Sequence, residues 1–176
     1  MKKFLVAFIA ILILSPNVSK AQQSEDEWVL SSGVGYSLQF NIINQWNDGT
    51  SGIPPIYFNA DYGMNDHFSL GVGISHGSIS SESFFAREFS LTRTNLGIRG
   101  LFHFGNNPKL DHYSGVRLGV SVSNFEGDFE DETGGEFQPR VFYGMRSYFN
   151  DDIGVNLEVG VGLPYFFNGG VVFRIK

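Results

Sequence analysis

The stretch from residue 153 to residue 163 alternates strictly between two kinds of side chain. Every second residue is Ile, Val or Leu, and the positions between them hold Gly, Asn or Glu. Successive side chains of a β-strand point to opposite faces, so this stretch predicts a strand with one aliphatic face and one small or polar face. The same pattern recurs along the chain, with glycine or polar residues opposite each apolar row. A barrel in lipid needs this arrangement, apolar outside and polar inside.

The N-terminus carries the one continuous apolar run of the sequence, Phe4 to Leu14. Lys2 and Lys3 precede this run, and small residues end it near Ala21, which is the pattern of a cleaved signal peptide. The run is short for a spanning helix, which needs about 20 residues, although a membrane anchor stays an alternative. We therefore expect a signal peptide over 1–21, a short leader over 22–27 and one outer-membrane β-barrel domain over 28–176.

Composition narrows the chemistry of the chain. The sequence has 22 glycines, 18 phenylalanines and no cysteine. Abundant Gly and Phe disfavour a helical bundle, and the absence of Cys excludes disulfides, thiolate metal sites and a lipoprotein anchor. Cleavage after Ala21 removes 3 of the 12 basic residues and leaves 9 against 18 acidic ones, a formal charge of -9. This acidic balance argues against a nucleic-acid partner.

The alternation predicts an all-β fold, an eight-stranded antiparallel up-and-down transmembrane β-barrel. The first six strands are expected at 28–41, 54–64, 67–77, 89–104, 111–123 and 137–149, and the last two form the hairpin around Pro164. The apolar parity changes within 89–104, which predicts a bulge near Arg93. Short turns are expected on the periplasmic side and longer loops outside the cell. Closure requires the last strand to pair with the first, since lipid tolerates no open edge.

A soluble eight-stranded barrel, similar to a lipocalin, is the alternative fold. Its polar face would be strongly hydrated and rich in Lys, Glu and Asp, whereas the polar rows of this chain hold mostly Gly, Ser and Asn. The composition of the polar rows therefore favours the membrane barrel.

The final strand carries the most specific motif. Asn168, Gly170, Phe173 and Ile175 fit a polar, glycine, aromatic and hydrophobic spacing. With the repeated strands from Trp28 onward, this motif resembles the small outer-membrane β-barrel proteins of Gram-negative bacteria, of OmpA and OmpX type. The end of the signal peptide at Ala21-Gln22 resembles those common in Bacteroidetes. The resemblance implies that the four residues are the signal read by the barrel-assembly machinery. The chain ends in Lys176 where the family pattern has an aromatic residue.

Charged residues share the polar, lumen-facing parity of several strands. A charge in a narrow, low-dielectric lumen needs a partner. We therefore expect an Arg–carboxylate network that fills the lumen, with Asp61 and Glu158 as its acids. The expected network comprises Asp61, Arg99, Arg117, Arg146, Glu158 and Arg174, and Arg140 shares their parity.

Two motifs suggest hydrolytic chemistry. Gly73 to Gly77 matches G-x-S-x-G, but it lies in an alternating strand, where a nucleophile elbow would need a strand, a turn and a helix. His112 and Ser114, with Glu126, resemble the triad of outer-membrane lipid A deacylases. Glu126 is expected at the far end of the same strand, roughly 40 Å away, so this reading predicts no working relay.

Two further groups of residues have simpler interpretations. The acidic stretch 126–136 is expected to be a solvated loop, and clustered carboxylates leave a divalent-cation site as an alternative. Aromatic residues near strand ends predict girdles at the membrane interfaces. These residues are Trp28, Phe68, Phe104, Tyr113, Phe149, Tyr165 and Phe166.

The sequence thus predicts a monomeric outer-membrane barrel with a structural or surface-interaction role. It is expected to be no enzyme and to bind no cofactor, metal or nucleic acid. Its expected partners are outer-membrane lipid, lipopolysaccharide and the barrel-assembly machinery. A narrow porin-like channel for ions or small solutes is the first alternative function, and a lipid A-modifying hydrolase is the second.

Overall fold

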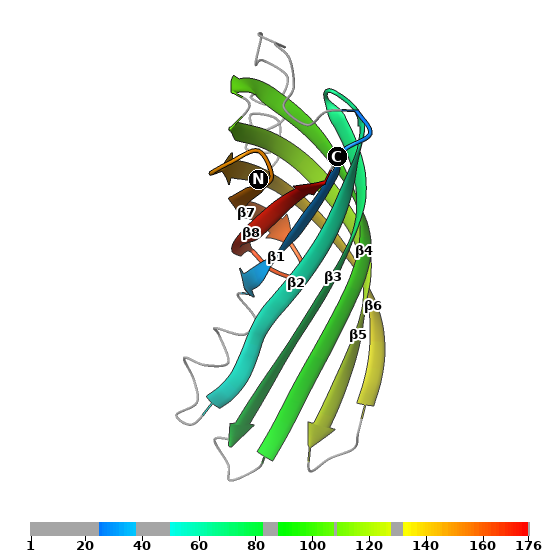
Figure 1. Cartoon of the computed structure of the whole chain (residues 1–176). Helices are drawn as coiled ribbons and strands as arrows, with labels where there is room; N and C mark the ends of the chain where they lie inside the picture. The colour runs from blue at the N-terminus through cyan, green and yellow to red at the C-terminus, as the bar shows by residue number, and fades with distance from the viewer. Residues whose placement is uncertain (1–24, 38–49, 83–87, 108, 128–131, 176) are drawn as a thin grey trace, which may run out of the picture.

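The computed structural model describes residues 25–37, 50–82, 88–107, 109–127 and 132–175. The expected signal peptide and the first half of the expected leader, 22–24, lie outside these residues. The described chain forms a closed barrel in which each strand pairs with its sequence neighbours and β8 pairs with β1 (Figure 1). The strands are β1 (Trp28–Tyr36), β2 (Thr50–Asn65), β3 (Phe68–Glu82), β4 (Glu88–Asn107), β5 (Leu110–Gly127), β6 (Glu132–Tyr148), β7 (Ile153–Gly162) and β8 (Phe167–Ile175). All pairings are antiparallel, which confirms the predicted fold class.

The seam between β1 and β8 closes the barrel. It runs in unbroken register from Trp28 opposite Ile175 to Tyr36 opposite Phe167. Closure leaves no strand edge along this ladder without hydrogen bonds, as a barrel in lipid requires. The structure therefore confirms the pairing of the last strand with the first.

The two ends of the barrel differ. At the end that carries Trp28 and Ile175, here called the turn end, short turns join β2 to β3, β4 to β5 and β6 to β7. The side chains of Asn65, Asn107 and Asn150 each accept a backbone N–H two residues further on, at 2.9–3.0 Å. Asn favours turns because its side chain can make this local bond. The opposite end is called the loop end below.

The strands reach the loop end unequally. β2 to β6 contain 15 to 20 residues each, whereas β7, β8 and β1 contain 9 or 10. The long strands consequently form a wall that extends well past the short ones, toward the bottom of Figure 1. The predicted loops at 78–88 and 126–136 are too long, since β3 continues to Glu82, β4 begins at Glu88, β5 continues to Gly127 and β6 begins at Glu132.

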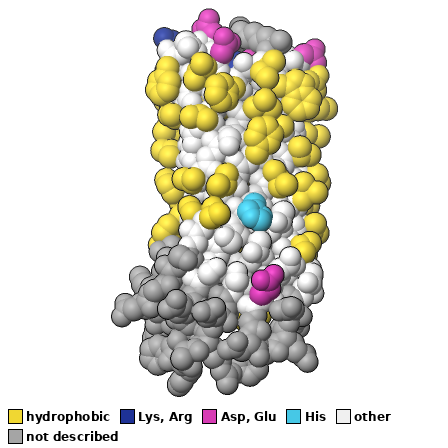
Figure 2. Space-filling model, turned by 60° about the horizontal axis from the view of Figure 1, so that its bottom comes forward, with side chains coloured by type: hydrophobic (Ala, Val, Ile, Leu, Met, Phe, Trp, Pro, Cys, Tyr) yellow, Lys and Arg dark blue, Asp and Glu magenta, His cyan; other side chains and the backbone are white. Residues whose placement is uncertain are grey.

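The outer surface changes character along the long strands. On β3 the outward residues from Phe68 to Ile74 are apolar and 40–53% exposed. Beyond them come His76, Ser78 and Ser80, which also face outward. Figure 2 shows this change on one face, where a hydrophobic band gives way to a zone of mostly uncharged polar side chains. The alternating pattern fades in this zone because the outward positions there are no longer apolar, so sequence periodicity ends the strands too early.

The predicted bulge near Arg93 is wrong. β4 pairs residue by residue with β3 from Glu88 to Phe102 and with β5 from Phe89 to Phe104, without a shift near Arg93. The parity change has another cause. Past the apolar band, apolar side chains appear on the inner face, where Ile79, 1% exposed, lies opposite Leu91. Irregularities occur instead at Ile53/Ile56, Gly63/Asn65 and Phe104/Asn107.

No helix among the described residues is long and apolar enough to cross a membrane.

Candidate functional site: the ion-paired lumen

The centre of the lumen brings three arginines into one register row. Arg99 on β4 lies opposite Arg117 on β5, and Arg117 lies opposite Arg140 on β6. Like charges on directly opposed residues destabilise a sheet unless something compensates them. All three side chains are at most 2% exposed, so water does not provide that compensation.

Carboxylates from other strands compensate the row. Glu158 on β7 reaches Arg99 through Oε1 at 2.6 Å and Arg140 through Oε2 at 3.0 Å. Asp61 on β2 reaches Arg99 Nε at 2.9 Å and Arg146 Nη2 at 2.5 Å. Each carboxylate therefore bridges two arginines, and the pairs tie β2, β4, β6 and β7 together through the lumen.

Arg117 is held differently. Its guanidinium donates to Asn95 Oδ1 at 2.5 Å, to the Gly73 carbonyl at 2.8 Å and to the Tyr165 hydroxyl at 3.3 Å. No described carboxylate forms a salt bridge with it, contrary to the expected acid partner. Neutral oxygen acceptors bind its two terminal nitrogens instead. Three of the four buried arginines of this centre, Arg99, Arg140 and Arg146, share the carboxylates Asp61, Asp111 and Glu158, and Arg117 is the fourth.

Arg174 lies near the turn end, apart from this centre. Its Nε is 3.1 Å from Oε1 of Glu27, and its guanidinium stacks 3.9 Å above the ring of Tyr148. Val29, Tyr148 and Val172 form a buried apolar cluster there. Glu27 precedes β1 and Arg174 belongs to β8, so this pair spans the seam.

Aromatic side chains fill the space between the charges. Arg99 and Arg140 lie 5.1 and 4.8 Å from the ring centroid of Phe142, and Arg146 lies 4.6 Å from that of Tyr113. Tyr113 also donates its hydroxyl to Glu158 at 2.9 Å. Cation–π contacts of this kind are favourable where the cation is desolvated. Lumen aromatics thus share the stabilisation of the arginines with the acids.

The connection between β7 and β8 closes the lumen toward the loop end. Tyr165, 1% exposed, lies 4.6 Å from the Arg140 guanidinium and 5.7 Å from the ring of Tyr57, measured to ring centroids. Beyond it, Asn95 donates to Gln138 at 2.7 Å and Gln138 donates to Ser121 at 2.7 Å. Polar and aromatic side chains therefore fill successive levels of the lumen.

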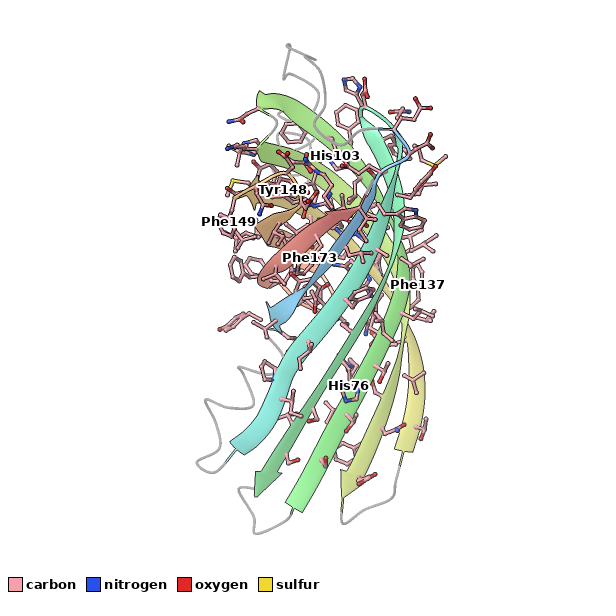
Figure 3. The ribbon with its side chains drawn as sticks, viewed as in Figure 1. His76, His103, Phe137, Tyr148, Phe149 and Phe173 are labelled. Carbon is pink, nitrogen blue, oxygen red and sulfur yellow. The ribbon has the colours of Figure 1, made fainter. Side chains whose placement is uncertain are left out.

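The girdle prediction is wrong for two residues. Tyr113 and Tyr165 are buried in the lumen, at 0% and 1% exposure. Tyr113 has the inward parity of β5, and Tyr165 turns inward from the connection between β7 and β8. Trp28, Phe68 and Phe149 are 40–68% exposed, as a girdle requires. The labels of Figure 3 show Phe149 and Tyr148 near the upper, turn end of the barrel.

A serine, a histidine and an aspartate meet near the turn end. The Oγ of Ser69 lies 2.7 Å from His103 Nε2, and His103 Nδ1 lies 2.8 Å from Asp111 Oδ1. Asp111 also contacts Arg146 Nη1 at 3.5 Å. These distances match those of a catalytic triad. The three residues are at most 1% exposed, so the trio has no path for an acyl substrate and serves the lumen network.

Sequence reasoning did not identify this trio. The signal was present, because His103 shares the inward parity of Arg99 on β4 and Asp111 shares that of Arg117 on β5. Glu27 was assigned to the leader, and its pairing with Arg174 depends on the closure of the seam.

The proposed deacylase residues do not come together. His112 Nδ1 lies 2.7 Å from the Tyr143 hydroxyl, while Glu126 is opposite Ser90 near the loop end. Ser114 is opposite Phe102 on the turn-end half. Ser75 of the G-x-S-x-G stretch lies inside β3, buried and opposite Tyr57 and Asn95. Neither motif forms a hydrolytic site.

The four residues of the expected assembly signal divide between the two faces of β8. Asn168 is fully buried and accepts from Arg140 at 3.3 Å, and Gly170 lies opposite Gly33 at the seam. Phe173 and Ile175 face outward, 43% and 49% exposed. Within the described residues, no group of three or more His, Asp or Glu side chains is arranged to hold a metal ion.

Solved structures share this fold at low sequence identity. The N-terminal β-barrel domain of OprF from Pseudomonas aeruginosa aligns with a TM-score of 0.60 and 12% identity, over 87% of this chain and 100% of that one. Ail, the attachment invasion locus protein of Yersinia pestis, aligns with 0.53 and 10%, over 86% and 99%. A de novo designed transmembrane β-barrel aligns with 0.54 and 14%, over 88% and 99%. No protein-family model matches the sequence, and no curated protein matches it. At these identities the likeness establishes the fold, that of small eight-stranded outer-membrane barrels.

Proposed function

We propose that this chain is a monomeric outer-membrane barrel with a structural and surface-interaction role, whose lumen is a plug. The observation that carries the proposal is the contrast between an apolar outer wall and a lumen filled by bridged charges. A buried charge persists only when it is paired and hydrogen-bonded, and Glu158 meets both conditions. Because outer-membrane barrels have short turns on the periplasmic side and longer loops outside, the turn end faces the periplasm and the loop end faces the outside of the cell.

The plug is supported by the number of strands it connects. Asp61 and Glu158 link β2, β4, β6 and β7, and the Arg174–Glu27 pair links β8 to the segment before β1. An eight-stranded barrel is only wide enough inside for side chains to fill it. Opening a conduit would require breaking several buried ion pairs at once.

Gel migration and conductance test the proposal. Folded protein in unboiled samples is expected to migrate differently from boiled protein, and reconstituted protein is expected to give no stable conductance steps in planar bilayers. Steady unitary conductance from heat-modifiable protein would contradict the plug. Absence of any heat-modifiable form would contradict the membrane barrel itself.

A narrow channel is the second candidate, and Arg117 favours it. With four buried arginines and three carboxylates, the lumen centre carries one formal positive charge in excess. If rearranged pairs open a conduit, it should therefore select anions. The reversal potential across a potassium chloride gradient distinguishes this candidate, since a cation-selective or absent current would exclude it.

We also propose that the chain is of OmpA and OmpX type, in its Bacteroidetes form. In this proposal the four residues of β8 act as the assembly signal. Asn168 and Gly170 hold the seam from inside, while Phe173 and Ile175 stay available on the outer face. Phe173→Ala should slow insertion catalysed by the assembly machinery and leave spontaneous folding in detergent nearly unchanged. Equal slowing in both assays would indicate a packing role and no recognition.

A further inference from the structure

The outer wall of β3 to β6 contains an apolar groove of about 310 Å³. The groove is open on its outer side and lined by apolar side chains, so part of one acyl chain can lie along it. Its side chains include Val72, Leu96, Ile98, Leu118, Val120 and Phe137.

Five hydroxyl side chains follow the groove toward the loop end. This hydroxyl patch consists of Ser78, Ser80, Ser90, Thr92 and Thr94, which face outward on β3 and β4. In register, Ser78 is opposite Thr92 and Ser80 is opposite Ser90, whose hydroxyls are 3.3 Å apart. His76 borders the patch, with Nδ1 at 2.9 Å from the Thr94 hydroxyl, and Figure 3 shows it far along the wall from His103.

The groove and the patch are adjacent on the same strands. Leu96 of the groove and Thr94 of the patch are successive outward residues of β4. Two residues of strand span about 7 Å, so a lipid whose chain occupies the groove would present its headgroup to the patch. The outer wall therefore offers one continuous amphipathic surface.

The chemistry of the patch selects the headgroup. Among the side chains that the structure describes on this part of the wall, no Lys or Arg faces outward beside the patch, and neighbouring Arg93 points inward, where its Nε donates to Ser123 at 2.9 Å. A phosphate-binding surface would need basic side chains. Uncharged donors and acceptors suit the hydroxyls of a sugar, since each Ser or Thr hydroxyl can both donate and accept.

We propose that this surface docks one lipopolysaccharide molecule of the outer leaflet, with an acyl chain in the groove and uncharged core sugars on the hydroxyl patch. The inference rests on the proposed outer-membrane location. It goes beyond that location because it assigns lipopolysaccharide binding to one face of the barrel, β3 to β6, and attributes the recognition to sugar hydroxyls.

The test is a titration of lipopolysaccharide into the protein held in dimyristoyl phosphatidylcholine nanodiscs. Two probes are compared, lipopolysaccharide with complete core sugars and lipopolysaccharide truncated after its innermost sugars. The patch variant Ser78→Ala/Thr92→Val/Thr94→Val is expected to bind the complete form about a hundredfold more weakly, the effect of losing three hydrogen bonds of ordinary net strength. It is expected to bind the truncated form as the wild type does. Unchanged binding of the complete form, or equal weakening for both forms, overturns sugar recognition at the patch.

Matched variants separate docking from folding. Ser32→Ala/Ser114→Ala removes outward hydroxyls elsewhere on the wall and should leave both affinities unchanged. Val72→Phe narrows the groove and should weaken both probes, whereas Val155→Phe on β7 should weaken neither. Full affinity of Val72→Phe for both probes would overturn the acyl-chain assignment. Heat-modifiable migration of every variant shows that the barrel itself is intact, so failure of docking is distinguishable from failure of the membrane barrel.

Discussion

Glu158 on β7 and Arg99 on β4 meet across the lumen with 2.6 Å between Oε1 and Nη2. Because Glu158 also holds Arg140 at 3.0 Å, its removal leaves two buried guanidinium groups short of one acid. We expect Glu158→Gln to lower the free energy of unfolding by about 3–5 kcal/mol, the cost of breaking a buried ion pair from one side. Guanidinium unfolding in lipid vesicles measures this change.

Glu126→Gln is the matched control. Glu126 is exposed on β5, and a surface substitution of this type changes stability by no more than about 0.5 kcal/mol. Equal effects of the two substitutions would show that the lumen pairs contribute nothing specific to stability.

Tyr165 and Phe166 are adjacent aromatics with opposite environments, 1% and 41% exposed. Tyr165→Ala empties the space between Tyr57 and Arg140 and removes a hydrogen bond from Arg117, so we expect a loss of about 3–5 kcal/mol. Phe166→Ala should cost less than about 1 kcal/mol. Thermal unfolding followed by circular dichroism provides the comparison. A larger effect of Phe166→Ala would contradict the assignment of Tyr165 to the packed lumen.

Gly33 and Gly170 face each other at the seam and permit unusually close strands. A Cβ on Gly170 would lie 2.0 Å from the Ser32 carbonyl oxygen, and one on Gly33 would lie 2.1 Å from that of Gly169. We expect Gly170→Ala to reduce the yield of heat-modifiable barrel severely, because backbone atoms must shift to admit the methyl group. Gly134→Ala, where a Cβ meets nothing within 4 Å, should fold like the wild type. Normal folding of Gly170→Ala would refute the close approach.

Ser69 should be chemically inert despite its bond to His103. Full burial denies reagents access to its hydroxyl, and a nucleophile must reach its substrate to react. We expect that a fluorophosphonate probe does not label the folded protein. We also expect that Ser69→Ala leaves the rate of ester hydrolysis unchanged. Labelling at Ser69 in folded protein would show that the turn end opens.

The alternation of side chains was sufficient to predict the barrel and the inward direction of Asp61, Arg99 and Glu158. It could not predict which acid meets which arginine, because partners across a lumen depend on the stagger of the closed barrel. Asp111 and His103 carried the correct parity and could have been included. Tyr165 carried no such signal, since it lies in a connection where the two-residue period has ended.

The loop-end extensions show the limit of the same reasoning. The two-residue alternation was interpreted as apolar residues outside and polar residues inside. On β3 and β4 the character of both faces changes at the end of the apolar band. Ile79 and Leu91 turn inward just where serines and threonines turn outward. In the sequence, such a reversal of polarity cannot be told from a β-bulge. The unbroken pairing of β4 in the structure shows that it is a reversal.

The unequal strand lengths give the barrel a front and a back. A cylinder with an even rim would look the same to neighbours approaching from any direction in the plane of the membrane. Here β2 to β6 form a long wall that extends toward the bottom of Figure 1, while β7, β8 and β1 stop well short of its end. Within the part of the chain that the structure describes, the loop end is therefore asymmetric about the barrel axis, with a polar wall on β2 to β6 that β7, β8 and β1 do not share.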